Sequence, residues 1–234
     1  MAGGGSLLTV PIMLFMGMPG PVANGTNRIA ILAQNITAVT AFFRRGFSDF
    51  KLSISLALAA LPGAIVGALV GTELSGDWFN RVVALVMIVV MVVMAMPDLT
   101  SKQNKDGKNE NTKPLTTKGL IAGHLCMVGA GFWGGFIQIG VGFLLMPILH
   151  RVMGLDLVRV NMHKVFVVLS YTLVALLIFS SRVEILWIAG LCLALGNAIG
   201  GWIGANMSVS RGEKLIKRVL NFVLAIFIIK LFFF

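Results

Sequence analysis

The chain has 234 residues, of which 57% are hydrophobic and only 12% charged, and its mean hydropathy is +0.93. A soluble domain carries roughly 25% charged residues to cover its surface, so this composition excludes an ordinary soluble protein. The formal net charge of +10 does not indicate a nucleic-acid partner, because the cations fall in short loops between apolar stretches, where they orient membrane segments.

Apolar stretches that approach the ~20 residues needed to cross a hydrocarbon core recur along the chain. They are continuous rather than alternating, which excludes a β-barrel and leaves α-helices as the way to pair the backbone within lipid. The predicted fold class is therefore all-α, a polytopic membrane protein. The clearest spans are residues 52–72, 79–97, 185–205 and 215–234.

The chain opens on a glycine-rich stretch and a short apolar segment, after which polar residues begin a helix. Pro19 and Pro21 mark the start of this helix. Polar groups are costly in a bilayer and tend to be functional there. The candidate site residues of this part are Gly4, Gly5, Asn24, Thr26, Asn27, Arg28 and Gln34.

Residues 98–118 form a hydrophilic linker rich in Lys, Asn and Thr. After it come the apolar residues 119–134, a predicted break at Gly134-Gly135, and another short segment that reaches Pro147. Cys126 and Cys192 lie within apolar segments and are expected to be packed thiols. The candidate site residues of this part are Gln138, Gly140, Gly142, Asn161, His163 and Lys164.

The two apolar halves resemble each other, which predicts a first membrane repeat at residues 1–97, the linker at 98–118 and a second repeat at 119–234. Glycines 63, 67 and 71 align with glycines 196, 200 and 204, and Asn24 aligns with Asn161. Equivalent loops carry opposite charge bias, which favours inverted repeats with discontinuous glycine-rich segments. The second half has an apolar segment before its glycine-rich stretch and the first does not, so the first segment of repeat 1 is expected to be missing.

A helix start exposes unpaired N–H groups and partial positive charge, which favour an anion. Arg28 and Lys164 each add a cation one turn further in, so both helix starts are expected to face one anion pocket. Other interpretations stay open: the two cations could snorkel to the headgroups, Asn24 and Asn161 could cap helices, and the glycines could serve close packing alone.

No carboxylate is expected in the middle of a span, so a carboxylate proton relay has no candidate, and His163 is the titratable group near the pocket that could respond near neutral pH. The sequence has no paired metal-ligand spacing, nucleophile elbow or phosphate loop. It therefore predicts no enzyme activity, no metal and no cofactor.

Two stretches carry a resemblance to a known family, AGGGSLLTVPIMLFMGMPGPVANGTNR at residues 2–28 and GFIQIGVGFLLMPIL at residues 135–149. With Gln34-Asn35 and Asn161, they resemble the sulfite exporter TauE/SafE family of membrane permeases over essentially the whole chain. The resemblance implies a bacterial or archaeal inner-membrane carrier for small sulfur-containing anions or organic acids. The positions that it carries over are Gly4, Gly5, Asn24, Thr26, Asn27, Gly140, Gly142 and Asn161.

The predicted function is a secondary transporter, an exporter, of a small anion such as sulfite, a sulfonate or a related organic acid. The expected partners are this anion and the lipid bilayer, and a homo-oligomer stays open. Two alternatives belong to other classes: a passive anion channel, and a membrane assembly factor that transports nothing.

Overall fold

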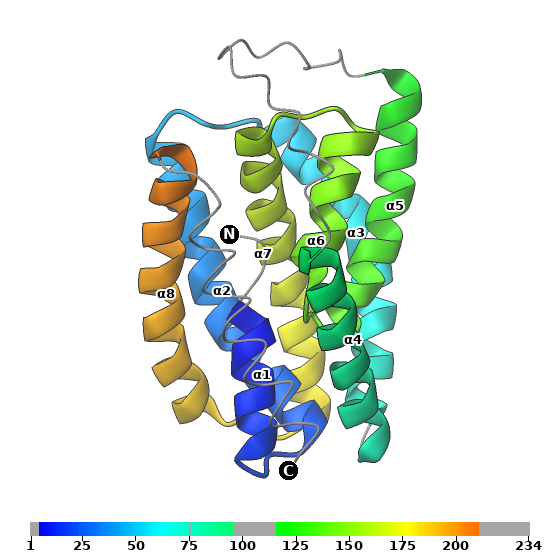
Figure 1. Cartoon of the computed structure of the whole chain (residues 1–234), viewed down its shortest axis with the longest axis vertical. Coiled ribbons are helices and arrows are strands. Elements are labelled where there is room, and N and C mark those ends of the chain that lie inside the picture. Colours follow the sequence, from blue (N-terminus) through cyan, green and yellow to red (C-terminus); the bar gives the residue numbers. More distant parts are fainter. Residues whose placement is uncertain (1–4, 75, 96–115, 211–234) are drawn as a thin grey trace.

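The computed structural model describes residues 5–74, 76–95 and 116–210. The regular structure in these ranges is entirely helical, which confirms the all-α prediction. Most helices run along the long axis of one bundle (Figure 1). In chain order they are α1 (Gly5–Phe15), α2 (Gly20–Arg44), α3 (Phe50–Glu73), α4 (Asp77–Ala95), α5 (Thr117–Phe136), α6 (Val141–Pro147), the π-helix η1 (Ile148–Val152), α7 (Leu157–Arg182) and α8 (Trp187–Ser210).

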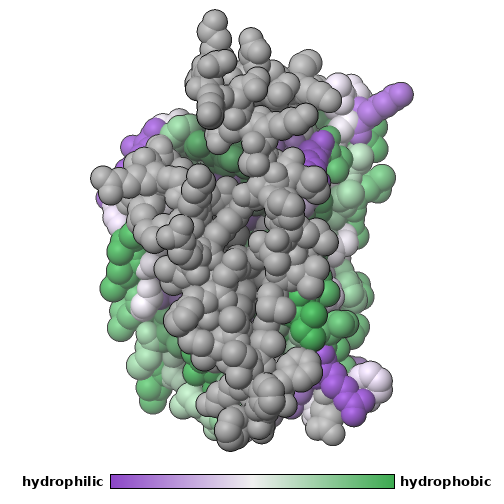
Figure 2. Space-filling view, viewed as in Figure 1, coloured by the Kyte–Doolittle hydropathy of each residue, from purple (hydrophilic) through white to green (hydrophobic). Residues whose placement is uncertain are grey.

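Four of the described helices, α3, α5, α7 and α8, are long and apolar enough to cross a membrane. The predicted spans 52–72, 79–97 and 185–205 correspond to α3, α4 and α8, and span 215–234 lies outside the described residues. Among the coloured atoms of Figure 2, hydrophobic side chains line the flanks of the bundle and most hydrophilic ones lie near its ends. This distribution is that of a multi-pass membrane protein.

Helices from the first half of the chain pack against helices from the second half. α2 packs along α8, and α3 packs along both α5 and α7. α2 and α7 run antiparallel, since Phe42 packs with Met162 near one end and Gly25 lies against Phe179 near the other. Corresponding helices of inverted repeats must run in opposite directions, and this pair does. The duplication itself stays a prediction.

Two short segments have the lengths expected of discontinuous helices. α1 has 11 residues, which at 1.5 Å per residue is about 16 Å, against about 30 Å for a hydrocarbon core. α6 and η1 together form the second short segment, Val141–Val152. Each segment is followed by a glycine with positive φ, Gly17 at 84° and Gly154 at 74°. The α6–η1 segment is therefore too short to cross a full bilayer, and the described part of α1 is equally short.

The predicted break at Gly134-Gly135 is wrong, because both glycines lie inside α5. They are small because neighbouring helices approach them closely. A Cβ at Gly135 would lie 2.1 Å from the Ala64 carbonyl oxygen, and one at Gly134 would lie 2.5 Å from the Tyr171 ring. The chain leaves the helix after Phe136 and forms the α5–α6 turn, residues 137–140.

The glycine triplet of α3 serves close helix packing. A Cβ at Gly63 would lie 1.9 Å from the carbonyl oxygen of Val128, and one at Gly67 would lie 2.0 Å from that of Phe132, both on α5. The aligned glycines of α8 differ: no atom of the described residues lies within 4 Å of a Cβ built at Gly196 or Gly200.

This difference gives a matched pair of substitutions. Gly63→Ala is expected to lower the free energy of unfolding by about 1–3 kcal/mol, because the methyl group must push two helix backbones apart. Gly196→Ala is expected to have no effect or to stabilise by up to about 1 kcal/mol, because alanine is the better helix former. Unfolding by SDS titration in mixed micelles measures both. Equal effects would contradict the close α3–α5 packing.

The two cysteines are not packed thiols as predicted, since Cys126 and Cys192 are both exposed. The buried face of α5 consists of other residues, including Gly123, Met127 and Gly131. Hydropathy cannot separate these faces in sequence, because lipid accepts an apolar side chain as readily as a protein core does.

Candidate functional site

The polar cluster near the start of α2 is fully buried. Asn24, Thr26, Asn27 and Arg28 are each 0% exposed. Asn24 lies one turn inside the helix, whose N-cap position is Pro19, so Asn24 does not cap it. The cluster therefore points into the protein rather than to the headgroups.

Each of these side chains connects α2 to another part of the bundle. Asn24 donates from Nδ2 to the carbonyl of Phe136 at 2.8 Å. Thr26 accepts at Oγ1 from the backbone N–H of Leu186 at 3.1 Å, and Asn27 accepts at Oδ1 from the Thr9 hydroxyl of α1. These three predicted site residues thus position the end of α5, the start of α8 and α1.

Arg28 holds the C-terminal end of α5. Its guanidinium donates to the carbonyl oxygen of Gly134 at 3.2 Å and to that of Gly135. The ring of Phe179 on α7 lies 4.4 Å from the guanidinium carbon, within the range of a cation–π interaction. Snorkelling is therefore wrong for Arg28.

The α5–α6 turn places an amide at the centre of the bundle. Gln138 has φ of 61°, a left-handed conformation that is uncommon for a residue other than glycine, and it is 1% exposed. Its Nε2 donates to the Thr172 hydroxyl at 2.8 Å. Its Oε1 is buried with no hydrogen-bond partner among the described residues. Gly140, with φ of 71°, then provides the N-cap of α6.

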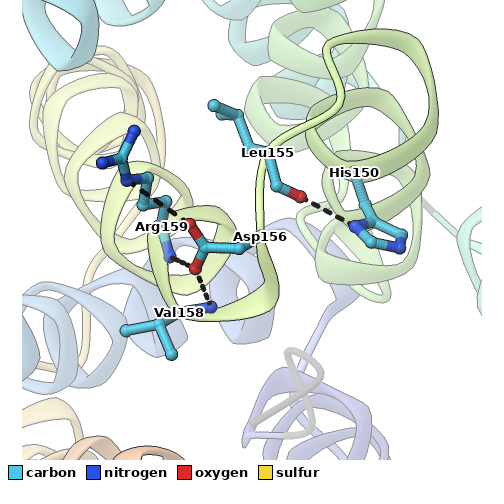
Figure 3. A network of polar contacts seen from close by, with 5 residues as sticks. All are labelled: His150, Leu155, Asp156, Val158 and Arg159. Atoms are coloured by element: carbon cyan, nitrogen blue, oxygen red, sulfur yellow. Dashed lines mark hydrogen bonds and ion pairs between the residues drawn. The ribbon is translucent and has the colours of Figure 1, made fainter. Parts of the chain in front are cut away.

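The start of α7 is fixed by the residues before it. Asp156 accepts the backbone N–H groups of Val158 and Arg159, both at 3.0 Å, and His150 donates from Nδ1 to the Leu155 carbonyl at 2.8 Å (Figure 3). The first N–H groups of α7 are therefore occupied by the carboxylate of Asp156. The prediction of free helix-start N–H groups that bind an anion is wrong here.

The second polar cluster lies one turn further along α7. Asn161, His163 and Lys164 are 8%, 0% and 4% exposed. Lys164 donates from Nζ to Asn161 Oδ1 at 2.7 Å. Asn161 does not cap the helix, because Asp156 holds the N-cap position. Burial of Lys164 also excludes snorkelling for this cation.

A pocket lies between α2, α7, α1 and the start of α6. Lys164 is the one charged side chain among the described residues that line it. Four predicted site residues meet there: Gln34, Gln138, Gly142 and Lys164. We call this cavity the Lys164 pocket.

The structure does not bring both cations into this pocket. Arg28 is not among its lining residues, and its guanidinium contacts Phe179, which lies fifteen positions after Lys164, or about 22 Å along α7. The expectation of a pocket with two cations is therefore wrong. Of the remaining predicted residues, Gly5 begins α1, and Gly4 lies outside the described residues.

The predicted site residues omit two polar residues of the pocket, Ser6 and Asn35, although Asn35 belongs to the Gln34-Asn35 pair that supported the family resemblance. Both are buried, and Asn35 donates from Nδ2 to the Ile31 carbonyl at 2.7 Å within its own helix. Their proximity in sequence to Gly5 and Gln34 was the available signal. Among the described residues, no group of three His, Cys, Asp or Glu side chains could hold a metal ion.

Comparison with known proteins shows the family. The family described as sulfite exporter TauE/SafE matches residues 1–231. The chain belongs to this family. The resemblance found in the sequence is confirmed, and the chain is a multi-pass membrane protein.

Curated relatives of this TauE/SafE chain are described as membrane transporters. The probable membrane transporter protein ORF9 of Sinorhizobium sp is 27% identical over 94% of this chain and 81% of the relative. The probable membrane transporter protein YfcA of Escherichia coli (strain K12) is 27% identical over 99% and 83%. The probable membrane transporter protein YunE of Bacillus subtilis (strain 168) is 23% identical over 94% and 87%. No solved structure matches the chain.

Proposed function

We propose that this chain is a secondary transporter that exports a small oxyanion, such as sulfite, a sulfonate or a related organic acid. Membership of the TauE/SafE family and the transporter names of its relatives support a membrane transporter. The class of substrate follows from the side chains of the Lys164 pocket.

The observation that carries the proposal is the burial of Lys164 in a largely apolar cavity whose other polar side chains are uncharged. An ammonium group within a membrane bundle is costly, and such groups mark substrate pathways. The described lining adds the amides of Gln34, Asn35 and Gln138 and the hydroxyl of Ser6, and it contains no acid. One positive charge beside uncharged amide and hydroxyl groups, with no acid among the described lining, suits an oxyanion.

A carrier must open the pocket to each side of the membrane in turn. The short helices α1 and α6–η1 are our candidates for the discontinuous helices that surround the binding site in many transporters, since Ser6 of α1 and Gly142 of α6 line the Lys164 pocket. The α5–α6 turn joins one of them to α5 and carries Gln138 into the pocket. We propose that movement at this turn alternates access, while Arg28 keeps the end of α5 in place.

Counterflow in proteoliposomes tests this function. Vesicles that contain the purified protein and unlabelled methanesulfonate are expected to accumulate external radiolabelled methanesulfonate transiently, with saturation. Sulfite, sulfate and acetate as competitors then rank the substrates. Flux that follows voltage without counterflow would establish a channel instead. Absence of flux when each of the four anions is labelled in turn would leave the assembly-factor alternative.

A further inference from the structure

Three consecutive residues of α7 reach three different environments. Lys164 lines the pocket that we assign to the anion. Met162 lines a second cavity, together with Ser48, Asp49 and Ser53. His163, between them in sequence, is completely buried. His163 lines neither cavity, but its two sequence neighbours each line one, and the second cavity lies beside the loop that connects α2 to α3.

One ring nitrogen of His163 forms a hydrogen bond, and the other forms none with the described residues. Its Nδ1 lies 2.8 Å from the hydroxyl oxygen of Ser53 on α3. Its Nε2 is buried and has no hydrogen-bond partner among the described residues. A buried polar atom without a partner costs about 1–3 kcal/mol, and such atoms in native proteins call for a functional explanation. Ser53 itself lines the second cavity, so a hydroxyl connects that cavity to the imidazole.

The second histidine–serine pair of the bundle shows the contrast. His124 of α5 donates from Nδ1 to the Leu120 carbonyl at 2.8 Å and accepts at Nε2 from the Ser55 hydroxyl at 2.7 Å. Both of its ring nitrogens have hydrogen-bond partners. His124 thus has hydrogen bonds at both ring nitrogens, whereas His163 has a hydrogen bond at one of them.

Acidic residues do not offer an alternative proton carrier within the described bundle. Asp49 and Asp156 are N-caps of α3 and α7, Glu73 ends α3, Asp77 begins α4, and Glu184 lies between α7 and α8. Asp49, Asp156 and Arg159 act electrostatically on His163. Other charged or titratable side chains lie on the elements that pack around this part of α7. The end of α2 and the start of α3 contribute Arg44, Arg45, Asp49 and Lys51. α5, η1 and α7 with its N-cap contribute Lys118, His124, His150, Arg151, Asp156, Arg159 and Lys164.

We propose that His163 is a proton-binding site that couples proton movement to anion transport, with Ser53 as the relay from the second cavity. This inference rests on the proposed anion pocket at Lys164. In the neutral ring with its proton on Nε2, Nδ1 accepts from the Ser53 hydroxyl. An entering proton, carried as hydronium in the second cavity, reaches Nδ1 when Ser53 gives its hydroxyl proton to the ring and takes the hydronium proton in exchange. When the anion leaves on the other side, the imidazolium gives up one proton to water there and the ring is neutral again.

Proton and anion then favour each other's binding. A protonated His163 adds a second positive charge next to Lys164, which strengthens anion binding, and the bound anion stabilises the imidazolium to the same extent because the coupling is reciprocal. A monovalent anion that moves with one proton crosses without net charge. At zero voltage, a pH difference of one unit is then expected to hold about a tenfold anion ratio in favour of the side with the higher pH, so the carrier exports the anion when the internal concentration exceeds that ratio.

The test uses methanesulfonate, which keeps its charge at all pH values near neutrality, in proteoliposomes clamped at zero voltage with valinomycin and equal potassium. A pH-sensitive dye inside the vesicles is expected to report proton entry when the anion is added to the wild type. In His163→Gln, proton entry and the tenfold accumulation are both expected to disappear. In the control His124→Gln, both are expected to persist.

Ser53→Ala provides a second variant that keeps the imidazole, and it is expected to slow proton entry at least about tenfold. Thermal unfolding of each variant shows whether it is folded. Anion counterflow in the wild type without proton entry would overturn the coupling and leave the transporter standing. Proton entry that persists in folded His163→Gln and at the full rate in Ser53→Ala would also overturn it. Absence of counterflow in the wild type would overturn the transport function itself.

Discussion

Replacing Lys164 with Gln is expected to reduce methanesulfonate counterflow about 30-fold or more. Lys164 is the one charged residue among the described lining of its pocket, and it is 4% exposed. Removing one partner from a buried, hydrogen-bonded charge pair costs about 2 kcal/mol or more, which corresponds to that factor in affinity. The Gln side chain can still donate to Asn161 Oδ1, so the helix itself is expected to remain folded.

The matched control is Lys118→Gln, which removes the same charge from an exposed residue of the first turn of α5. Its counterflow is expected to equal that of the wild type. Lys164→Arg keeps the charge with a different shape and is expected to retain part of the transport. Wild-type counterflow in Lys164→Gln, with normal thermal unfolding, would remove Lys164 from the site and with it the proposed anion pocket.

Arg28→Ala is expected to lower the free energy of unfolding by about 3–5 kcal/mol. The substitution leaves the carbonyls of Gly134 and Gly135 without their guanidinium donor, at about 1–3 kcal/mol for each buried group. It also removes the cation from the Phe179 ring and opens a cavity, because Arg28 heads the largest fully buried side chains. Unfolding in SDS-mixed micelles measures the loss.

Two further arginine variants define what Arg28 does. Arg28→Lys keeps the charge but not the planar pair of donors, and it is expected to recover only part of the stability. Arg182→Ala removes an exposed arginine whose ion pair with Glu73 spans 3.4 Å, and it is expected to change stability by less than about 1 kcal/mol. A fully stable Arg28→Ala that has lost counterflow would instead place Arg28 on the substrate path.

These two cations show where sequence reasoning succeeded and where it did not. Both stand in polar clusters one turn inside a helix, and both are buried, as the cost of charge in lipid predicts. The local sequence does not distinguish the role of Arg28 from that of Lys164. In the structure one binds backbone carbonyls at the end of α5 and the other lines a cavity. The distinction depends on which helix lies opposite each side chain, and this information is absent from local sequence.

His163 and Ser53 illustrate the same limit. His163 was a candidate because histidine titrates near neutral pH, whereas Ser53 lies 110 positions away in an apolar helix and gave no local signal. Only the packing of α3 against α7 brings them together. The break in the second half was misplaced for a related reason: glycines 134 and 135 suit a turn in sequence, but close contacts with Ala64 and Tyr171 keep them helical.

The sequence by itself determined the class of this protein, because hydropathy and backbone hydrogen bonding in lipid leave only helices of membrane length. It also determined the family, through its glycine-rich and polar motifs. The tertiary structure alone decided which cation lines a pocket, which binds backbone and which faces of the apolar helices meet lipid. The physical reason is that an apolar helix face is accommodated equally well by lipid and by protein. Which face is buried therefore depends on close contacts between helices that are distant in the chain.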